Sequence, residues 1–277
     1  MEIRPLADHA EYHAVERLQA EVWTLPDVEI VPLHVLITAA KNGGLLLGAF
    51  DGDLLAGFVF GFPGLTAEGR LKHCSHMAGV HPAYRDQNLG YRLKLAQREH
   101  VLAQGIDLIT WTFDPLEARN AWLNFGKLGA VCNTYLRNIY GDMRDGLNTG
   151  LPSDRLQVDW WIRSDRVERR LRGEDDPPSS NSSLKGRRAG SDSLTPTESV
   201  GTSSGSLSQR ERGDRRIIAI PLHIQAIKSV DMTLAMKWRM DTRRAFENAF
   251  AQGYHASEVV RQDNELCYLL QAANQQT

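Results

Sequence analysis

Cysteine is scarce in this chain, and its spacing gives no sign of a crosslinked fold. The 277 residues include three cysteines, Cys74, Cys132 and Cys267, which lie far apart and form no C-x-x-C pair. This spacing excludes a disulfide framework and a zinc ribbon as the basis of the fold. We therefore expect no bound metal ion.

A long apolar run and an excess of positive charge are also missing. The longest apolar region, residues 43–62, is interrupted by Asp51 and Asp53 and is unsuited to span a membrane. The formal net charge is -2, whereas nucleic-acid-binding proteins usually carry a basic excess. The opening residues MEIRPLADHAEY lack the pattern of a signal peptide. We expect a cytoplasmic protein that binds neither membranes nor nucleic acid.

The chain does have an ordinary globular composition, with 42% hydrophobic and 24% charged residues, and one highly informative stretch. That stretch reads VHPAYRDQNLGYRLKLAQREH, from Val80 to His100. A short strand ends at Val80, a basic turn follows over residues 85–90, and an amphipathic helix begins at Leu89. The N–H groups of such a turn and the positive end of the helix dipole point at one spot. They favour a phosphate there.

This turn resembles the phosphate-binding signature of the GNAT superfamily of N-acyltransferases. In that signature a basic residue or Gln is followed by x-x-G-x-G/A. Here the turn begins at Arg85, Asn88 stands in place of the first glycine, and Gly90 is the second. Asparagine is the next most tolerant residue of the left-handed conformation, so we expect the turn to form. A basic surface turn before a helix is the alternative interpretation.

The elements that follow strengthen the resemblance. Residues 106–112 read as a buried strand, and a helix that begins near Glu117 carries Asn120. Its ending, residues 127–130, is similar to the K-x-G-F-like ending of the family's next motif. Over residues 1–164 we expect a strand, two helices, three strands, a helix, a strand, a helix and two strands. This is the order of the GNAT fold, so the resemblance covers about 160 residues.

Three regions are expected along the chain. Residues 1–164 form a mixed α/β (α+β) domain of the GNAT type with splayed central strands. Residues 165–215 are dominated by Ser, Gly, Pro and mixed charges, which predicts a disordered linker. Within it, residues 201–205 match G-x-S-x-G, but without the strand that a nucleophile elbow requires. Residues 216–277 predict a strand, a helix and a hairpin. This segment is too small to be stable alone, so it should dock on the first domain or on a partner subunit, and a homodimer is an open alternative.

The resemblance implies that an acyl-CoA, with acetyl-CoA as the first candidate, is the donor substrate. In the GNAT fold the pantetheine arm lies against the first splayed strand like an added strand. The turn at 85–91 would hold the pyrophosphate, the preceding strand would pair with pantetheine, and Asn120 would contact the arm. A backbone N–H near Met77 or Ala78 would stabilise the oxyanion. The implied cofactor-binding residues are Ala78, Val80, Arg85, Gln87, Asn88, Leu89, Gly90, Tyr91 and Asn120.

The base that deprotonates the amine is sought on the same strand, which reads LKHCSHMAGV and has no carboxylate. Its imidazoles, His73 and His76, are the available groups, and His76 is our first candidate. Strand alternation places His76 on one face with Ala78 and places His73 on the other. A bulge near Gly79 would reverse this assignment.

Other interpretations of these residues stay open. Either histidine could instead be a core residue, and Asp114, directly after the next strand, is the alternative base. A turn or helix-cap role competes for Asp114. Strand alternation divides His73, Cys74 and His76 between two faces, which argues against a metal site.

The acid that protonates the departing thiolate differs from the family's pattern. Many relatives place a Tyr just before the K-x-G ending, and Phe125 stands there in this sequence. Tyr135 or Tyr140 could substitute from the next strand, and Tyr140 is our choice. The polar run at 142–155 is expected to border the acceptor pocket, where Arg144 and Arg155 could clamp a substrate carboxylate. A plain surface loop is the alternative.

These observations predict an acyl-CoA-dependent N-acyltransferase that acts on a small amine such as an amino acid. Two alternatives stay open. The chain could be a non-catalytic acyl-CoA-binding sensor or assembly module, because its usual acid is lost. It could also be a protein N-acetyltransferase that combines the same donor site with a peptide groove.

Overall fold

The computed structural model describes residues 1–24, 29–143, 145–174, 210–212 and 215–272. The greater part of the predicted linker and its G-x-S-x-G letters therefore lie outside the described residues. No helix in these ranges is long and apolar enough to cross a bilayer.

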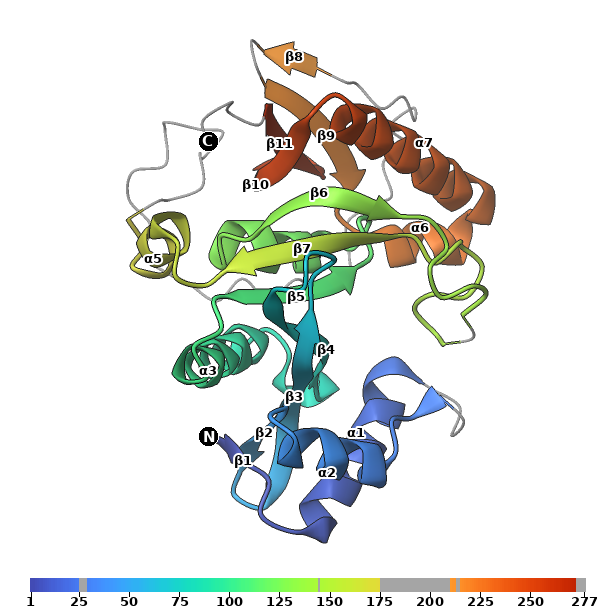
Figure 1. Ribbon diagram of the computed structural model, residues 1–277. Helices are drawn as coiled ribbons and strands as arrows, with labels where there is room; N and C mark the ends of the chain where they lie inside the picture. Colours follow the sequence, from blue (N-terminus) through green and yellow to red (C-terminus); the bar gives the residue numbers. More distant parts are fainter. Residues whose placement is uncertain (25–28, 144, 175–209, 213–214, 273–277) are drawn as a thin grey trace, which may run out of the picture.

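The first part of the chain has the predicted order of helices and strands, which is confirmed (Figure 1). Its elements are β1 (Glu2–Pro5), α1 (His9–Trp23), α2 (Leu33–Lys41), β2 (Leu45–Asp51), β3 (Leu54–Leu65), β4 (Leu71–Val80), α3 (Leu89–Ala103), β5 (Leu108–Phe113), α4 (Ala118–Ala121), β6 (Val131–Leu136) and β7 (Arg155–Trp161). A short turn of 3-10 helix at Pro82–Tyr84 precedes α3, and a π-helical turn at Trp122–Lys127 extends α4.

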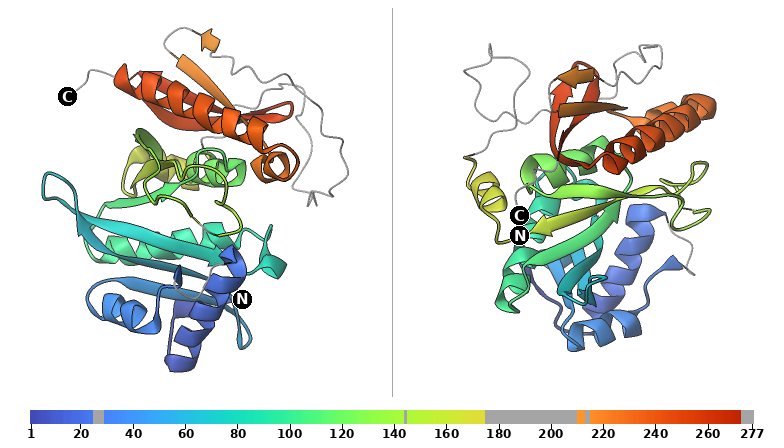
Figure 2. Two further views of the ribbon diagram at one scale, coloured as in Figure 1. Left: turned by 90° about the vertical axis from the view of Figure 1, so that its right-hand side faces the viewer. Right: turned by 45° about the horizontal axis from the view of Figure 1, so that its top comes forward.

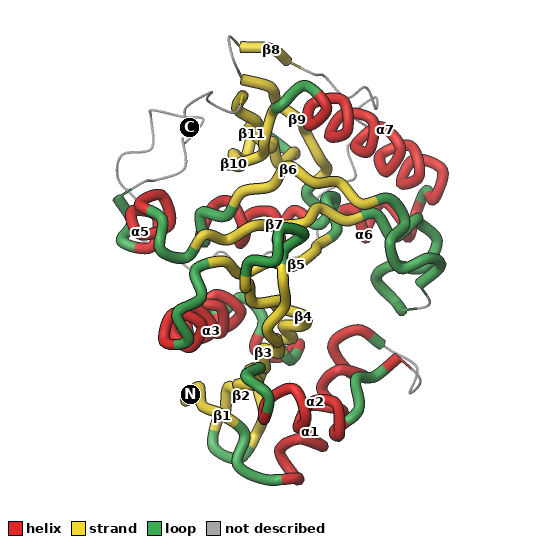
Figure 3. The backbone as a smooth tube through the Cα atoms, in the orientation of Figure 1, coloured by secondary structure: helices red, strands yellow, loops and turns green. Residues whose placement is uncertain are grey.

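The remaining elements follow β7 along the chain (Figure 3). They are α5 (Asp165–Leu171), β8 (Arg210–Arg212), β9 (Arg215–Pro221), α6 (Ile224–Val230), α7 (Met232–Ala251), β10 (Tyr254–Gln262) and β11 (Glu265–Ala272).

The described strands form one mixed sheet in the order β1-β2-β3-β4-β5-β7-β6-β10-β11-β9-β8. Helices α1 and α2 cover one face of the first four strands, and α3 covers the other (Figure 2). The alternation of β3 explains these two layers. Phe58 and Phe60 pack with Leu36 of α2, whereas Val59 packs with Leu89 and Leu93 of α3.

The C-terminal segment shares the sheet and the largest core cluster with the rest of the chain. β10 pairs with β6 through Ala256 and Cys132. Phe246 of α7 and Tyr268 of β11 are fully buried in the same cluster as Phe125 and Trp160. Within the described residues the segment therefore lies on the first part of the same chain, which gives its small core enough apolar surface to bury.

The predicted start of the linker at residue 165 is wrong. Residues 165–171 form α5, and the side chain of Ser164 caps the helix by accepting a hydrogen bond from the N–H of Val167. Arg170 is 7% exposed and donates to Glu258 of β10 at 2.7 Å. This partner is 88 residues away in the sequence, so composition alone could not reveal that the charge is satisfied.

Candidate active site

Strands β4 and β5 are paired at one end and diverge at the other (Figure 1). Their parallel register contains two pairs, His73 with Ile109 and Cys74 with Thr110. Beyond Cys74, the edge of β4 that faces β5 pairs with no strand in the described residues. Backbone N–H and C=O groups on such an edge need partners, so this edge is suited to an extended, amide-bearing ligand.

The turn before α3 has the conformation that the sequence predicts. Asn88 has φ 56° and ψ 17°, so asparagine here adopts the left-handed conformation that favours glycine. The first backbone hydrogen bond into α3 runs from the N–H of Arg92 to the oxygen of Asn88. The preceding N–H groups, including that of Gly90, therefore lie at the open end of the helix, where they favour an anion.

The side chains of this turn are mostly exposed or tied to the protein. Arg85 is exposed, and Lys127 of the π-helical turn donates to the side-chain oxygen of Asn88. Asp86 accepts from Arg119 at 2.6 Å, which neutralises the acidic residue of the turn. A Cβ atom at Gly90 would meet only the Cγ2 of Val80, at 3.9 Å, so the space in front of this residue is open.

Among the other predicted donor-site residues, some side chains are packed in the core and others are exposed. The side chains of Leu89, Tyr91 and Val80 pack into hydrophobic clusters, so only their backbone groups remain for a ligand. Ala78 lies on the unpaired part of β4, and Asn120 is exposed on α4. Gln87 is exposed, and its amide lies 3.4 Å from the oxygen of Ala83.

A β-bulge in β4 occurs at His76. Phe60 of β3 faces Met77, but the next residue of β3, Gly61, faces Ser75. His76 is therefore the extra residue of β4. The bulge thus lies three residues before Gly79, the position where a bulge could have reversed the faces, and the predicted grouping of Met77 with His73 and Ser75 is wrong. The bulge turns Met77 onto the face of α1, away from His73 and Ser75.

The two histidines consequently differ in environment. The exposed His76 ring lies 5.9 Å from the rings of Phe60 and Phe62, and partial burial lowers its pKa. His73 is completely buried and its Nε2 lies 3.1 Å from the amide of Gln97. Burial, and then the charge of Lys94, lower the pKa of His73 to about 4. His73 is therefore a core residue, whereas His76 is accessible to a substrate.

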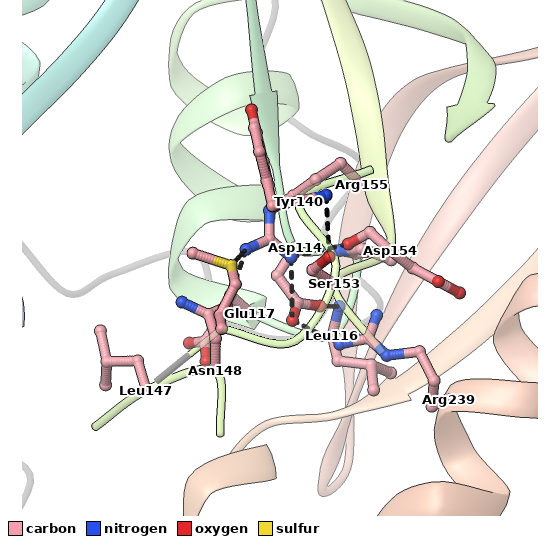
Figure 4. A network of polar contacts seen from close by, with 12 residues as sticks. Asp114, Leu116, Glu117, Tyr140, Leu147, Asn148, Ser153, Asp154, Arg155 and Arg239 are labelled. Atoms are coloured by element: carbon pink, nitrogen blue, oxygen red, sulfur yellow. Dashed lines mark hydrogen bonds and ion pairs between the residues drawn. The ribbon is translucent and has the colours of Figure 1, made fainter. Parts of the chain in front are cut away.

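Asp114, the alternative base, holds together two parts of the chain (Figure 4). One carboxylate oxygen accepts from the N–H of Leu116 at 2.8 Å, and the other accepts from Arg239 of α7. Arg155 adds a second cation 3.8 Å away. A carboxylate engaged on both oxygens is a poor base, so the structure favours the turn and ion-pair role for Asp114.

Tyr140 lies in the loop after β6 rather than in a strand, and its side chain is 53% exposed. Its hydroxyl lies 2.8 Å from that of Thr112, on the part of β5 that has separated from β4. Arg155 is 6% exposed and donates to Asn148 at 2.7 Å, so it braces the loop. The expectation that Arg155 clamps a substrate is therefore wrong. Arg144, also in this loop, lies outside the described residues.

Asp159 of β7 is a candidate site residue that sequence reasoning missed. It faces Thr110 across the β5–β7 register. Burial raises the pKa of its carboxyl, although Lys72 of β4 counteracts this effect. It alternates with the buried Val158 and Trp160, so it points to the opposite face of the sheet. That alternation was visible in the sequence and could have identified it.

Phe125, in the position of the family's acid, is fully buried. Its ring lies 6.1 Å from that of Phe113 and 5.7 Å from that of Tyr268. A π-helical turn often marks a functional site, but here it delivers an apolar ring into the core. No group of three or more His, Cys, Asp or Glu side chains suited to a metal ion occurs in the part of the chain that the structure describes.

No protein-family model and no curated protein matches this sequence. Solved structures do resemble it. The ribosomal-protein-S18-alanine N-acetyltransferase from Escherichia coli is 16% identical, with a TM-score of 0.46, and the match covers 59% of this chain and 94% of that one. The aminoglycoside 6'-acetyltransferase type Ii is 18% identical, with a TM-score of 0.46 and coverage of 59% and 99%. Arabidopsis thaliana Naa50 with a bisubstrate CoA analogue is 16% identical, with a TM-score of 0.43 and coverage of 57% and 96%.

Proposed function

We propose that this protein is an acyl-CoA-dependent N-acyltransferase of the GNAT type. The observation that carries the proposal is the unpaired edge of β4, which begins after Cys74 and ends beside the open N-terminus of α3. An extended arm with amide groups and a pyrophosphate at one end fits both features at once. Coenzyme A has this chemistry. Arg85 and the N–H groups around Gly90 would hold the pyrophosphate, and residues 75–80 would pair with the pantetheine arm.

The acceptor amine would approach from the face of the sheet that carries His76. The imidazole is exposed and its lowered pKa keeps it neutral at pH 7, as a base requires. Asp159 on β7 is a second candidate for the base, because its raised pKa makes the carboxylate a better proton acceptor. A β4 N–H next to the bulge, at Met77 or Ala78, would stabilise the oxyanion. The exposed hydroxyl of Tyr140 is placed to contact the acceptor.

We propose acetyl as the acyl group and a small amine, such as an amino acid, as the acceptor. Acetyl is the smallest common acyl group, and the bulged part of β4 lies against the rings of Phe60 and Phe62. Exposed polar groups on the acceptor face, at His76 and Tyr140, are suited to a polar amine rather than to an apolar one.

Calorimetric titration with CoA and a thiol-release assay test this function. The donor panel is acetyl-, propionyl- and succinyl-CoA, and the acceptor panel contains amino acids, polyamines and peptides with free N-termini. We expect CoA to bind. For at least one combination of acyl-CoA donor and amine acceptor, we expect thiol release only when the amine is present. Absence of CoA binding by a folded protein would refute the proposal.

A non-catalytic acyl-CoA-binding module is the second candidate, and the burial of Phe125 favours it. Because this ring replaces the usual acid and is covered by Tyr268, the chain has lost one catalytic group of the family's pattern. CoA binding without thiol release across the whole panel would support this alternative.

A further inference from the structure

A buried polar cluster lies where β4 and β5 separate, on the side of α3. The Lys94 side chain of α3 is 5% exposed, and its Nζ donates to the hydroxyl of Ser75 at 2.7 Å and to Oε1 of Gln97 at 3.2 Å. The same Nζ lies 3.8 Å from the centre of the Trp111 ring. Ser75 and Trp111 are the first residues beyond the last registered pair of the two strands. The ammonium group therefore lies at the point of divergence.

This lysine is not explained by the stability of the fold. Among the described residues no carboxylate pairs with Lys94, and a buried cation without a counter-ion destabilises a protein. Burial lowers the pKa of Lys94 to about 7. A cation–π contact with the indole ring of Trp111 partly stabilises the charged form of Lys94. A site that retains such a group has the features expected of a functional position.

The distance along β4 brings the reacting sulfur to this cluster. The strand from Val80, beside the N-terminus of α3, to Ser75 spans five steps of about 3.3 Å, or about 16 Å in total. A pantetheine arm, with two amide units and an extended backbone, has a similar length. If the pyrophosphate lies at α3 and the arm follows β4, the thioester arrives beside Ser75 and the ammonium of Lys94.

We propose that the ammonium of Lys94 stabilises the departing thiolate of CoA as an ion pair, in place of the acid lost at Phe125. This inference rests on the proposed function. In the reaction, the amine nitrogen forms a bond to the acyl carbon, and the carbon–sulfur bond breaks with its electron pair on sulfur. The negative charge that forms on sulfur is paired with the ammonium of Lys94, and CoA leaves as the thiolate. The proton released by the attacking amine passes to the base, His76 or Asp159, and from there to solvent, while Lys94 keeps its proton.

Ser75 and Gln97 are positioning residues in this arrangement. The hydroxyl of Ser75 accepts from Lys94 and donates to Oε1 of Gln97 at 3.0 Å, which fixes the direction of the ammonium. The other titratable groups next to the cluster are His73 on β4 and His100 on α3. Burial lowers the pKa of both imidazoles, so they are neutral above pH 7 and do not compete as cations.

The test titrates the thiol of bound CoA by the ultraviolet absorbance of its thiolate, so that no acceptor amine is needed. The proteins are the wild type, Lys94→Met and Arg92→Met. Methionine is close to lysine in volume and removes the charge, and Ser75 retains Gln97 as a partner, so we expect Lys94→Met to fold. Arg92 is an exposed cation of the same helix that donates to the Met1 carbonyl, which makes it the matched control.

In the wild type and in Arg92→Met we expect bound CoA to form thiolate at a pH about one to three units below that of free CoA. In Lys94→Met the shift should disappear, with unchanged affinity for desulfo-CoA, which lacks the sulfur. Where turnover is measurable, kcat should fall by about 10²–10³. An unshifted thiol in the wild type, or the same shift in Lys94→Met, would overturn the role of Lys94 while CoA binding stands. A wild-type protein that binds neither CoA nor desulfo-CoA would refute the proposed function itself. If Lys94→Met does not fold, the wild-type titration still decides the question.

Discussion

The ring of Phe125 packs edge-on against Tyr268, with centroids 5.7 Å apart and planes at 78°. Phe125 comes from the π-helical turn after α4, and Tyr268 comes from the last strand of the chain. The hydroxyl of Tyr268 donates to the Pro115 carbonyl at 2.7 Å. The C-terminal segment thus closes over the position where the family's pattern has its acid, and the volume there is apolar and filled.

The first prediction concerns this contact. Phe125→Tyr should lower the free energy of unfolding by about 1–3 kcal/mol, because the new hydroxyl is buried without a partner. It should not raise turnover, since the hydroxyl cannot reach the donor site. Urea unfolding and thiol release measure the two effects. An increase in rate would mean that Phe125 lies at the reacting centre after all.

The second prediction concerns the turn before α3. Gly90→Val should reduce CoA affinity at least tenfold, because the added side chain occupies the open space in front of the helix N-terminus. The fold should survive, since a Cβ there meets only Val80. The control is Ala103→Val at the exposed last residue of the same helix, which carries the same β-branched change. Calorimetry and thermal melting compare the two variants. Retained affinity in folded Gly90→Val would contradict the donor site.

The third prediction separates the candidate bases by pH dependence. A histidine base must be neutral, and the lowered pKa of His76 places the acidic limb of kcat/KM below pH 6.5. A carboxylate base must be ionised, and the raised pKa of Asp159 places its limb above pH 3.8. His76→Ala or Asp159→Asn should therefore remove the limb and lower kcat/KM by about 10²–10⁴, with CoA affinity unchanged. If both variants keep the limb, neither residue is the base.

The fourth prediction concerns stability and His73. The pKa of His73 is about 4 when folded and 6.5 in the unfolded reference, so the unfolded chain binds its proton first as pH falls. The stability that neutral His73 gives is complete above pH 6.5 and is lost progressively between pH 6.5 and 4. The loss is about 3 kcal/mol. His73→Gln should flatten this part of the stability profile, as denaturant unfolding at a series of pH values would show. An unchanged profile would contradict the burial of a neutral ring.

The fifth prediction concerns the ion pair between Asp114 and Arg239. Arg239→Met should lower the free energy of unfolding by about 3–5 kcal/mol, because Asp114 is left without its main cation. The double variant with Asp114→Asn should lose less than the sum of the single variants, since the pair acts as a unit. CoA affinity should not change. Additive losses would mean that the two side chains stabilise the fold separately.

Much of the fold follows from local features of the sequence. The turn at residues 85–90 carries its own signals, and Asn88 adopts the left-handed conformation that its residue type tolerates. The order of elements from β1 to β7 follows from apolar periodicity and from turn residues, which act over short distances. The same local signals failed at α5. There the charges of Arg170 are satisfied by Glu258, far along the chain.

In the candidate site, too, local sequence signals identified some features and distant contacts decided others. The residue types at His76 and Phe125 were evident from the sequence, but their roles depended on the backbone and on distant partners. One extra residue in β4 moved Met77 to the opposite face of the sheet, and Arg239 of α7 pairs with Asp114. The sequence by itself determined the order of elements from β1 to β7, the turn at residues 85–90 and the resemblance, because these depend on neighbours in the chain. Tertiary structure decided which side chains are exposed, paired or unpartnered, because burial and long-range charge pairing exist only once the sheet is assembled.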